Sequence, residues 1–119
     1  MKTELTKEQS LRLIEFGVPE RLATGSVFEL EPDYAYSNER FFWCFTLTDL
    51  LEILPKEIYY YGNRSDFNIN HYRLYGNGEE LWWATYSNLD GPFANCKELI
   101  DALYELTVYC LENGHLKFN

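Results

Sequence analysis

The strongest periodicity in the chain lies in its last segment, between Asn95 and Gly114. At about 100° per residue, the apolar positions of this segment cover well over half of a helix circumference. These positions are Leu99, Ile100, Leu103, Tyr104, Leu106, Thr107, Cys110 and Leu111. Asn95 and Glu98 stand at capping-box spacing, and Gly114 offers the left-handed residue that closes a helix. A helix that is apolar on most sides has to be buried, so we expect it to form the centre of the core.

Two further helices are predicted in the first half of the chain. Thr6 begins a capping box for a helix over residues 7–16, which the following glycine ends. Thr46 is the N-cap of a shorter helix over residues 47–54, and Asp49 lies in its first turn, where the helix dipole favours a carboxylate.

Strand-like stretches fill most of the remainder. Residues 26–31 alternate between apolar and polar, which is the period of a half-buried strand. Three later stretches are rich in the Tyr, Trp, Ile and Thr that strands prefer, at residues 57–61, 69–75 and 80–87. Gly76-Asn77-Gly78 joins the last two as a hairpin. The strand at 26–31 could join either edge of this sheet. Residues 34–40 are expected to be a loop or to pair at a sheet edge, and residues 88–92 are expected to be a turn.

The order of these elements predicts the fold class. Strands joined by a hairpin, with helices before and after them, indicate an antiparallel sheet that is covered on one face. We therefore expect an α+β fold with an antiparallel sheet of three to four strands, about three helices, and the C-terminal helix packed on the sheet. No repeat or flexible linker interrupts the order, so residues 1–119 are expected to form a single domain.

The charge balance narrows the possible partners. The chain of 119 residues has 19 acidic and 10 basic side chains, for a formal net charge of −9. Phosphate backbones are repelled by such a surface, so nucleic acid is not an expected partner. The surplus of acid either keeps copies of the chain apart in solution or meets a basic protein, as a mimic of DNA would.

The sequence does not point to a membrane or to an oxidising compartment. The longest apolar run, Phe41 to Phe45, is too short to cross a bilayer, and the N-terminus lacks an apolar targeting segment. Cys44, Cys96 and Cys110 are odd in number and do not have the spacing of metal ligands. We therefore expect reduced thiols in a cytoplasmic protein, without a membrane anchor, a cofactor or a metal.

Aromatic residues make up 18% of the chain and include the adjacent groups Tyr59-Tyr60-Tyr61 and Trp82-Trp83. Neighbours in a strand point to opposite faces, so one tryptophan, and either Tyr60 or its two flanking tyrosines, must lie away from the core. An exposed aromatic row would bind a protein partner, a sugar or a planar ligand; alternatively, a loop or a second copy of the chain buries it. Together with acidic positions of the last helix, the candidate surface residues are Tyr60, Trp82, Asp101 and Glu105.

Two residues are candidates for catalysis. His71 lies in a predicted strand, where an acid of the neighbouring strand could stand beside it. Cys96 falls at the predicted start of the last helix, where the helix dipole lowers the pKa of a thiol. The sequence shows no base or orienting partner for either residue, so we expect a protein that is not an enzyme.

Three stretches, one for each predicted helix, also carry a resemblance. They are Leu5–Gln9 with Leu13–Pro19, then Phe45–Pro55, then Glu98–Leu106 with Glu112-Asn113-Gly114. Together they resemble small uncharacterised proteins of gut Bacteroidetes and their phages or prophages. The shared residues are helix caps and core positions, so no site residue carries over. The resemblance implies a cytoplasmic accessory protein of a mobile element.

Residues and resemblance together predict a non-enzymatic protein-interaction module that acts through an acidic and aromatic surface. Its expected partner is a basic protein, and self-association into a homo-oligomer is also open. A small-ligand or carbohydrate binder on the aromatic face of the sheet is the alternative. An enzyme built around His71 or Cys96 is the third possibility.

Overall fold

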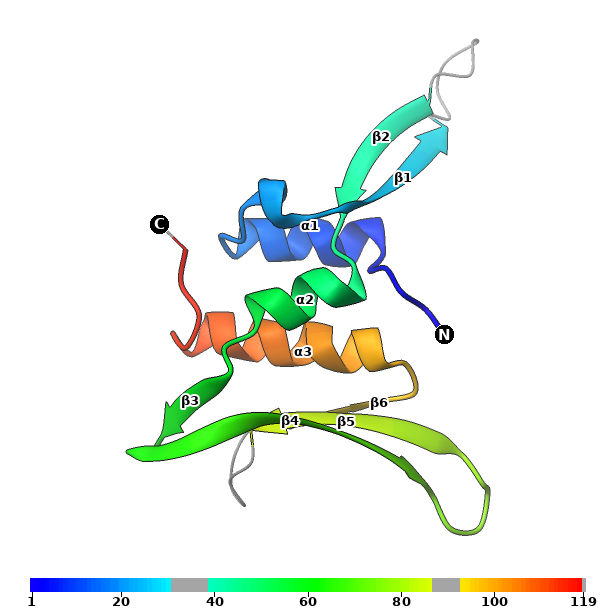
Figure 1. Ribbon diagram of the computed structural model, residues 1–119. Helices are drawn as coiled ribbons and strands as arrows, with labels where there is room; N and C mark the ends of the chain where they lie inside the picture. The colour runs from blue at the N-terminus through cyan, green and yellow to red at the C-terminus, as the bar shows by residue number, and fades with distance from the viewer. Residues whose placement is uncertain (31–38, 87–92, 119) are drawn as a thin grey trace.

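The computed structural model describes residues 1–30, 39–86 and 93–118, which form three α-helices and two antiparallel sheets (Figure 1). The helices are α1 (Lys7–Glu15), α2 (Leu47–Ile53) and α3 (Leu99–Glu112). A two-stranded sheet consists of β1 (Gly25–Leu30) and β2 (Glu39–Cys44), and a four-stranded sheet has the order β3 (Glu57–Tyr60), β4 (Asn63–Arg73), β5 (Glu80–Tyr86) and β6 (Phe93–Cys96). The predicted α+β fold, with the C-terminal helix packed on an antiparallel sheet, is confirmed.

Both ends of α1 are those that the sequence predicts. The Gln9 backbone N–H donates to Thr6 Oγ1 at 3.1 Å, and the Thr6 N–H donates to Gln9 Oε1 at 3.0 Å, so the capping box is complete. At the other end Gly17 has a φ of 105°, and the Val18 N–H donates to the Leu13 carbonyl at 3.0 Å. This is the closure in which a glycine takes the left-handed conformation and the leftover helix carbonyls find donors.

The start of α2 is tied to the start of β1 through one buried carboxylate. Thr46 and Asp49 cap the helix reciprocally, with the Thr46 N–H donating to Asp49 Oδ2 at 2.9 Å. The same carboxylate accepts hydrogen bonds from the Thr24 N–H and from Thr24 Oγ1, each at 2.9 Å. Asp49 is only 4% exposed. The predicted N-cap is therefore confirmed, and it also joins two elements that are distant in sequence.

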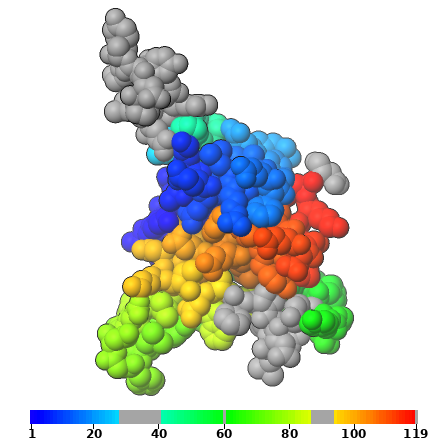
Figure 2. Space-filling view, turned by 180° about the vertical axis from the view of Figure 1, so that it is seen from behind, coloured from blue at the N-terminus to red at the C-terminus, as the bar shows by residue number. Residues whose placement is uncertain are grey.

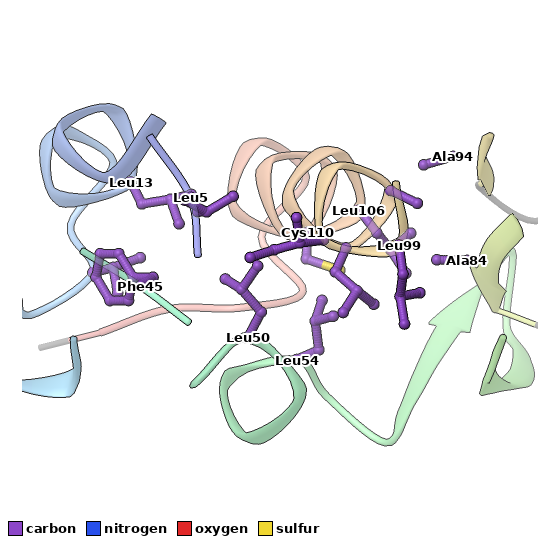
Figure 3. Close-up of a cluster of buried hydrophobic side chains, with 14 of the residues drawn as sticks. Leu5, Leu13, Phe45, Leu50, Leu54, Ala84, Ala94, Leu99, Leu106 and Cys110 are labelled. Carbon is purple, nitrogen blue, oxygen red and sulfur yellow. The ribbon is translucent and has the colours of Figure 1, made fainter. Parts of the chain in front are cut away.

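Helix α3 lies at the centre of the core. It packs on β5 and β6 on one side and on α2 on the other, and its buried side chains meet those of α2 and of the sheet (Figure 3). Seen from behind, α3 also lies beside α1 (Figure 2), where Gln9 Nε2 donates to Asp101 Oδ1 at 3.1 Å. The predicted apolar stripe is confirmed, since Ile100, Leu103, Leu106 and Cys110 are buried.

The sequence pattern does not predict strand β6, and because of this strand the last helix starts later than expected. Asn95 pairs with Trp83 of β5, so it is a strand residue. The helix begins four residues later, at Leu99, and its N-cap Glu98 makes no side-chain cap hydrogen bond. The predicted capping box of Asn95 and Glu98 is therefore wrong, because the ladder with β5 fixes the backbone that the cap would have needed.

Strand β2 is also absent from the predicted elements, and it determines where the first strand goes. The strand predicted at residues 26–31 pairs with β2, from Gly25 opposite Cys44 to Leu30 opposite Glu39, and joins neither edge of the four-stranded sheet. Gly25 permits this approach, because a Cβ there would lie 2.9 Å from the Cys44 carbonyl oxygen. Of the predicted loops, residues 34–38 and 88–92 lie outside the described residues.

The second strand of the four-stranded sheet starts earlier than predicted. The chain turns at Tyr61 and Gly62, which both have positive φ, and β4 pairs with β3 from Asn63 onward. The hairpin predicted at residues 76–78 is confirmed between β4 and β5. None of the described helices combines the length and the apolar character that crossing a membrane requires.

Candidate ligand-binding site

The register of β4, β5 and β6 divides their side chains between two faces. The helix face carries residues such as Ile69, Ala84 and Ala94, which pack in or against the core with α3. Asn70, Trp83 and Asn95 stand opposite one another on the three adjacent strands and belong to the other face. All three α-helices lie on the α3 side of the sheet (Figure 1), and we call the opposite side the open face.

The open face carries a hollow of about 640 Å³, lined by Asn70, His71, Tyr72, Trp83 and Asn95. Trp83 is 39% exposed. The rings of Tyr72 and Trp83 meet nearly at right angles, at 74°, with their centroids 6.4 Å apart. The row of Asn70, Trp83 and Asn95 therefore places one indole between two amide side chains, with a second aromatic ring beside it.

These groups suit a neutral ligand that has both apolar and hydroxyl groups. An indole offers a flat apolar surface and one N–H donor, and each asparagine amide is both a donor and an acceptor. His71 also lines the hollow, but its ring stacks on Trp82 of the helix face with centroids 4.2 Å apart. The site therefore offers stacking and uncharged hydrogen bonds.

His71 has the acidic neighbour that the sequence predicts. His71 Nε2 lies 3.7 Å from Glu80 Oε2 on β5. However, the same carboxylate accepts a hydrogen bond from Arg73 Nη2 at 2.9 Å, and this guanidinium lowers the pKa of Glu80 below its usual range. Glu80 is therefore held as an anion in an ion pair across β4 and β5, where it is a poor proton donor.

Cys96 is in a different environment from the one predicted. It ends β6 and lies outside the first turn of α3, so the prediction of a thiol activated by the helix dipole is wrong. Burial, followed by the nearby Glu105 carboxylate, raises the pKa of the Cys96 thiol to about 11. Cys110 is fully buried, and burial raises the pKa of its thiol to about 11 as well. Both sulfurs are protonated at neutral pH, which makes them poor nucleophiles.

These raised pKa values predict a loss of stability at alkaline pH. An unfolded thiol has a pKa of about 8.5, so between that value and about 11 the unfolded chain has released protons that the folded chain keeps. Burial also raises the pKa of the Tyr86 hydroxyl. The free energy of unfolding should be constant between about pH 7 and 8 and then fall as the pH approaches 11, by roughly 3 kcal/mol for the fully buried Cys110 thiol alone. Urea unfolding across this range measures it.

The matched variant for this test is Cys110→Ala. It removes one of the buried protons, so its stability should fall less steeply between about pH 9 and 11 than that of the unchanged chain. Identical slopes in the two proteins would contradict the assignment to this thiol.

Three of the four predicted surface residues lie around Cys96, and Tyr60 lies apart from them. Trp82 lies on the helix face opposite Cys96, and Glu105 is exposed on α3 beside the same cysteine. Asp101 is engaged within the chain, with Lys2 Nζ at 3.0 Å and Gln9 Nε2 at 3.1 Å. Tyr60 lies opposite Asn63 in β3, at the other edge of the sheet, and its side chain is outside the described part.

The residues that line the hollow are not the four predicted surface residues, but the expected division of the aromatic side chains between two faces is confirmed. One tryptophan of the pair does lie away from the core, and it is Trp83. Tyr59 and Tyr61 likewise point away, with 64% and 88% of their surfaces exposed. Asn70 and Asn95 are missing from the prediction, because asparagine gives no signal in a strand until the pairing of the strands is known.

No protein-family model matches the chain, and neither a curated protein nor a solved structure is significantly similar to it.

Proposed function

We propose that the protein is a non-enzymatic binding module that takes a neutral carbohydrate on the open face of its four-stranded sheet. The observation that carries this proposal is the row of Asn70, Trp83 and Asn95. One face of a sugar ring consists of C–H groups and packs on an indole, while the hydroxyl groups at its rim reach amides on either side. The hollow of about 640 Å³ has the size of a small-molecule site.

The titratable and nucleophilic side chains near the sheet favour a binding role over a catalytic one. The ring of His71 is stacked on Trp82, and its neighbouring acid Glu80 is held by Arg73. The Cys96 thiol is protonated at neutral pH, because burial and the Glu105 carboxylate raise its pKa. A general base or a nucleophile would need the opposite pKa shift.

We place this module in the cytoplasm, as an accessory protein of a phage or another mobile element. All three cysteines are present as thiols, which supports a reducing compartment. The resemblance of the three helix-forming stretches to small proteins of gut Bacteroidetes and their phages or prophages supports the association with a mobile element.

A second candidate is the predicted interaction module for a basic protein. It is favoured because several basic side chains are already paired within the chain. Lys2 pairs with Asp101, Lys97 with Glu79, and Arg64 with two carboxylates. In a chain of net charge −9, this leaves a surplus of acid at the surface, including the exposed Glu105. A partner held in this way would be released by salt and would not depend on Trp83.

The carbohydrate proposal is tested with an array of neutral oligosaccharides, followed by calorimetric titration of the tightest binder. Trp83→Ala should weaken binding at least about tenfold, since about 1.4 kcal/mol of lost stacking is enough for that factor. Asn70→Ala and Asn95→Ala should weaken it less, because each removes hydrogen bonds and leaves the indole in place.

The matched control is Trp43→Ala. Trp43 is 44% exposed, close to the 39% of Trp83, but it belongs to β2 in the other sheet. Its removal should leave sugar binding unchanged. The proposal fails if no neutral oligosaccharide binds at millimolar concentration, or if Trp83→Ala binds as tightly as the unchanged chain.

A further inference from the structure

One edge of the four-stranded sheet is covered along only part of its length. β3 pairs with Asn63 to Asp66 of β4, and the Phe67 N–H donates to the Lys56 carbonyl at 2.8 Å. β4 then continues to Arg73, paired with β5 on its other side. Within the described parts of the chain, no strand pairs with this continuation on the side away from β5 (Figure 1).

The register shows which backbone groups point to that edge. In an antiparallel ladder the N–H and C=O of one residue point to the same side, and successive residues alternate. Phe67 points toward β3, and Leu74 points toward β5, because its N–H donates to the Glu79 carbonyl at 2.8 Å. Ile69, His71 and Arg73 therefore present their N–H and C=O groups to the uncovered edge.

This edge lacks most of the features that usually prevent strand pairing. β4 and β5 are in continuous register from Phe67 to Arg73, so a bulge does not bend the strand, and the sequence of this stretch has no proline. It is also free of acid: Phe67 to Gly78 is the longest run without Asp or Glu in a chain that has 19 acidic side chains. Two acidic copies can approach along it without bringing carboxylates of β4 against each other.

We propose that two copies of the chain pair antiparallel along this edge, with His71 of one copy opposite His71 of the second copy. A two-fold axis at His71 pairs all three outward-pointing residues at once, because Ile69 of each copy then faces Arg73 of the other. Each of these pairs exchanges both of its backbone hydrogen bonds.

Neighbouring registers fit less well. An axis moved toward Ile69 would bring the second copy against β3, which already occupies the edge at Asn63 to Asp66. An axis moved to Arg73 would place two arginines opposite each other, which is unfavourable in a ladder. The axis at His71 is therefore the symmetric register that the strand itself selects.

The pairing would join the two four-stranded sheets into one. A two-fold axis between antiparallel strands is perpendicular to the sheet, so both open faces lie on the same side and both α3 helices on the other. The two Trp83 hollows would then face the same direction. The dimer does not depend on the carbohydrate proposal, because it needs only the backbone of β4.

Sedimentation equilibrium of the full chain tests the proposal. We expect a species of twice 14.1 kDa at micromolar concentration. His71→Pro should raise the dissociation constant by about tenfold or more, because proline removes an N–H from the uncovered edge. That N–H points away from β5, so the fold should persist, as circular dichroism would show.

A second pair of variants separates this effect from a folding defect. His71→Lys places two ammonium groups opposite each other across the axis, while within one chain the lysine lies beside Glu80, as His71 does. It should weaken the dimer about tenfold, whereas His71→Gln should not. The proposal is overturned if the unchanged chain is a monomer up to about 100 µM, a concentration at which even weak dimers are visible, or if His71→Pro and His71→Lys both dimerise normally.

Cross-linking tests the register directly. Residues in a hydrogen-bonded antiparallel pair have Cα atoms about 5.5 Å apart, which a disulfide can span. His71→Cys should therefore form a covalent dimer under mild oxidation. Asn77→Cys, exposed in the hairpin turn and away from the axis, should not. Cross-linking of Asn77→Cys without that of His71→Cys would overturn this register.

Discussion

Replacing Asp49 by alanine is expected to lower the free energy of unfolding by about 3–4 kcal/mol. The change leaves three donors without their acceptor: the Thr46 N–H, the Thr24 N–H and the Thr24 hydroxyl. It removes the cap of α2 and also its attachment to the start of β1. Asp49 is only 4% exposed, so the wild-type carboxylate makes these hydrogen bonds largely shielded from water. Urea unfolding at neutral pH measures the effect.

Two further variants serve as comparisons for Asp49→Ala. Glu52→Ala removes a carboxylate from the same helix at an exposed position and should cost less than about 0.5 kcal/mol. Thr24→Val removes one of the three donors and should cost about 1 kcal/mol. If Asp49→Ala costs no more than Glu52→Ala, the carboxylate does not hold α2 to β1.

Replacing Tyr86 by alanine is expected to cost about 4–5 kcal/mol, which is the upper part of the range for large aromatic side chains in a core. Tyr86 is fully buried on β5, and its ring lies 5.8 Å from that of Phe67. Its hydroxyl donates to the Pro55 carbonyl at 2.7 Å, and Cys110 Sγ lies 3.8 Å from the same oxygen. One side chain thus joins the sheet, α3 and the connection after α2. The midpoint and slope of urea unfolding report its loss.

Tyr86→Phe separates the ring from the hydroxyl. It keeps the packing and leaves the Pro55 carbonyl without its donor, so it should cost about 1–2 kcal/mol. A Tyr86→Phe variant as unstable as Tyr86→Ala would mean that the hydrogen bond, and not the filled volume, accounts for the effect.

The helix ends could be predicted from the sequence because the interactions that make them are local. The capping box at Thr6, the N-cap at Thr46 and the closure at Gly17 each involve residues within five positions of one another. The capping box predicted at Asn95 is wrong because a non-local interaction competes with it. The spacing of Asn95 to Glu98 satisfies the local rule, but the backbone of Asn95 pairs with Trp83. Pairing with a strand that is distant in the sequence therefore overrides the local capping preference.

The binding face could be predicted only in part, because the alternation in β5 is ambiguous. One face of that strand carries Leu81 and Trp83, and the other carries Trp82, Ala84 and Tyr86. Both sets are apolar and aromatic, so the pattern shows that one tryptophan faces outward without showing which. The packing of α3 on Ala84 decides it, and that contact links residues far apart in the chain. The two asparagines of the row become visible only once β4, β5 and β6 are aligned.

The position of α3 at the centre of the core also sets the order in which the protein can fold as it is synthesised. Helices α1 and α2 and the strands of both sheets all leave the ribosome before α3 does. Until then Leu50 and Leu54 are not covered by α3, and Lys2 lacks its hydrogen-bond partners Glu98 and Asp101. The nascent chain therefore carries exposed apolar side chains until α3 has emerged, which is the condition under which chaperones bind.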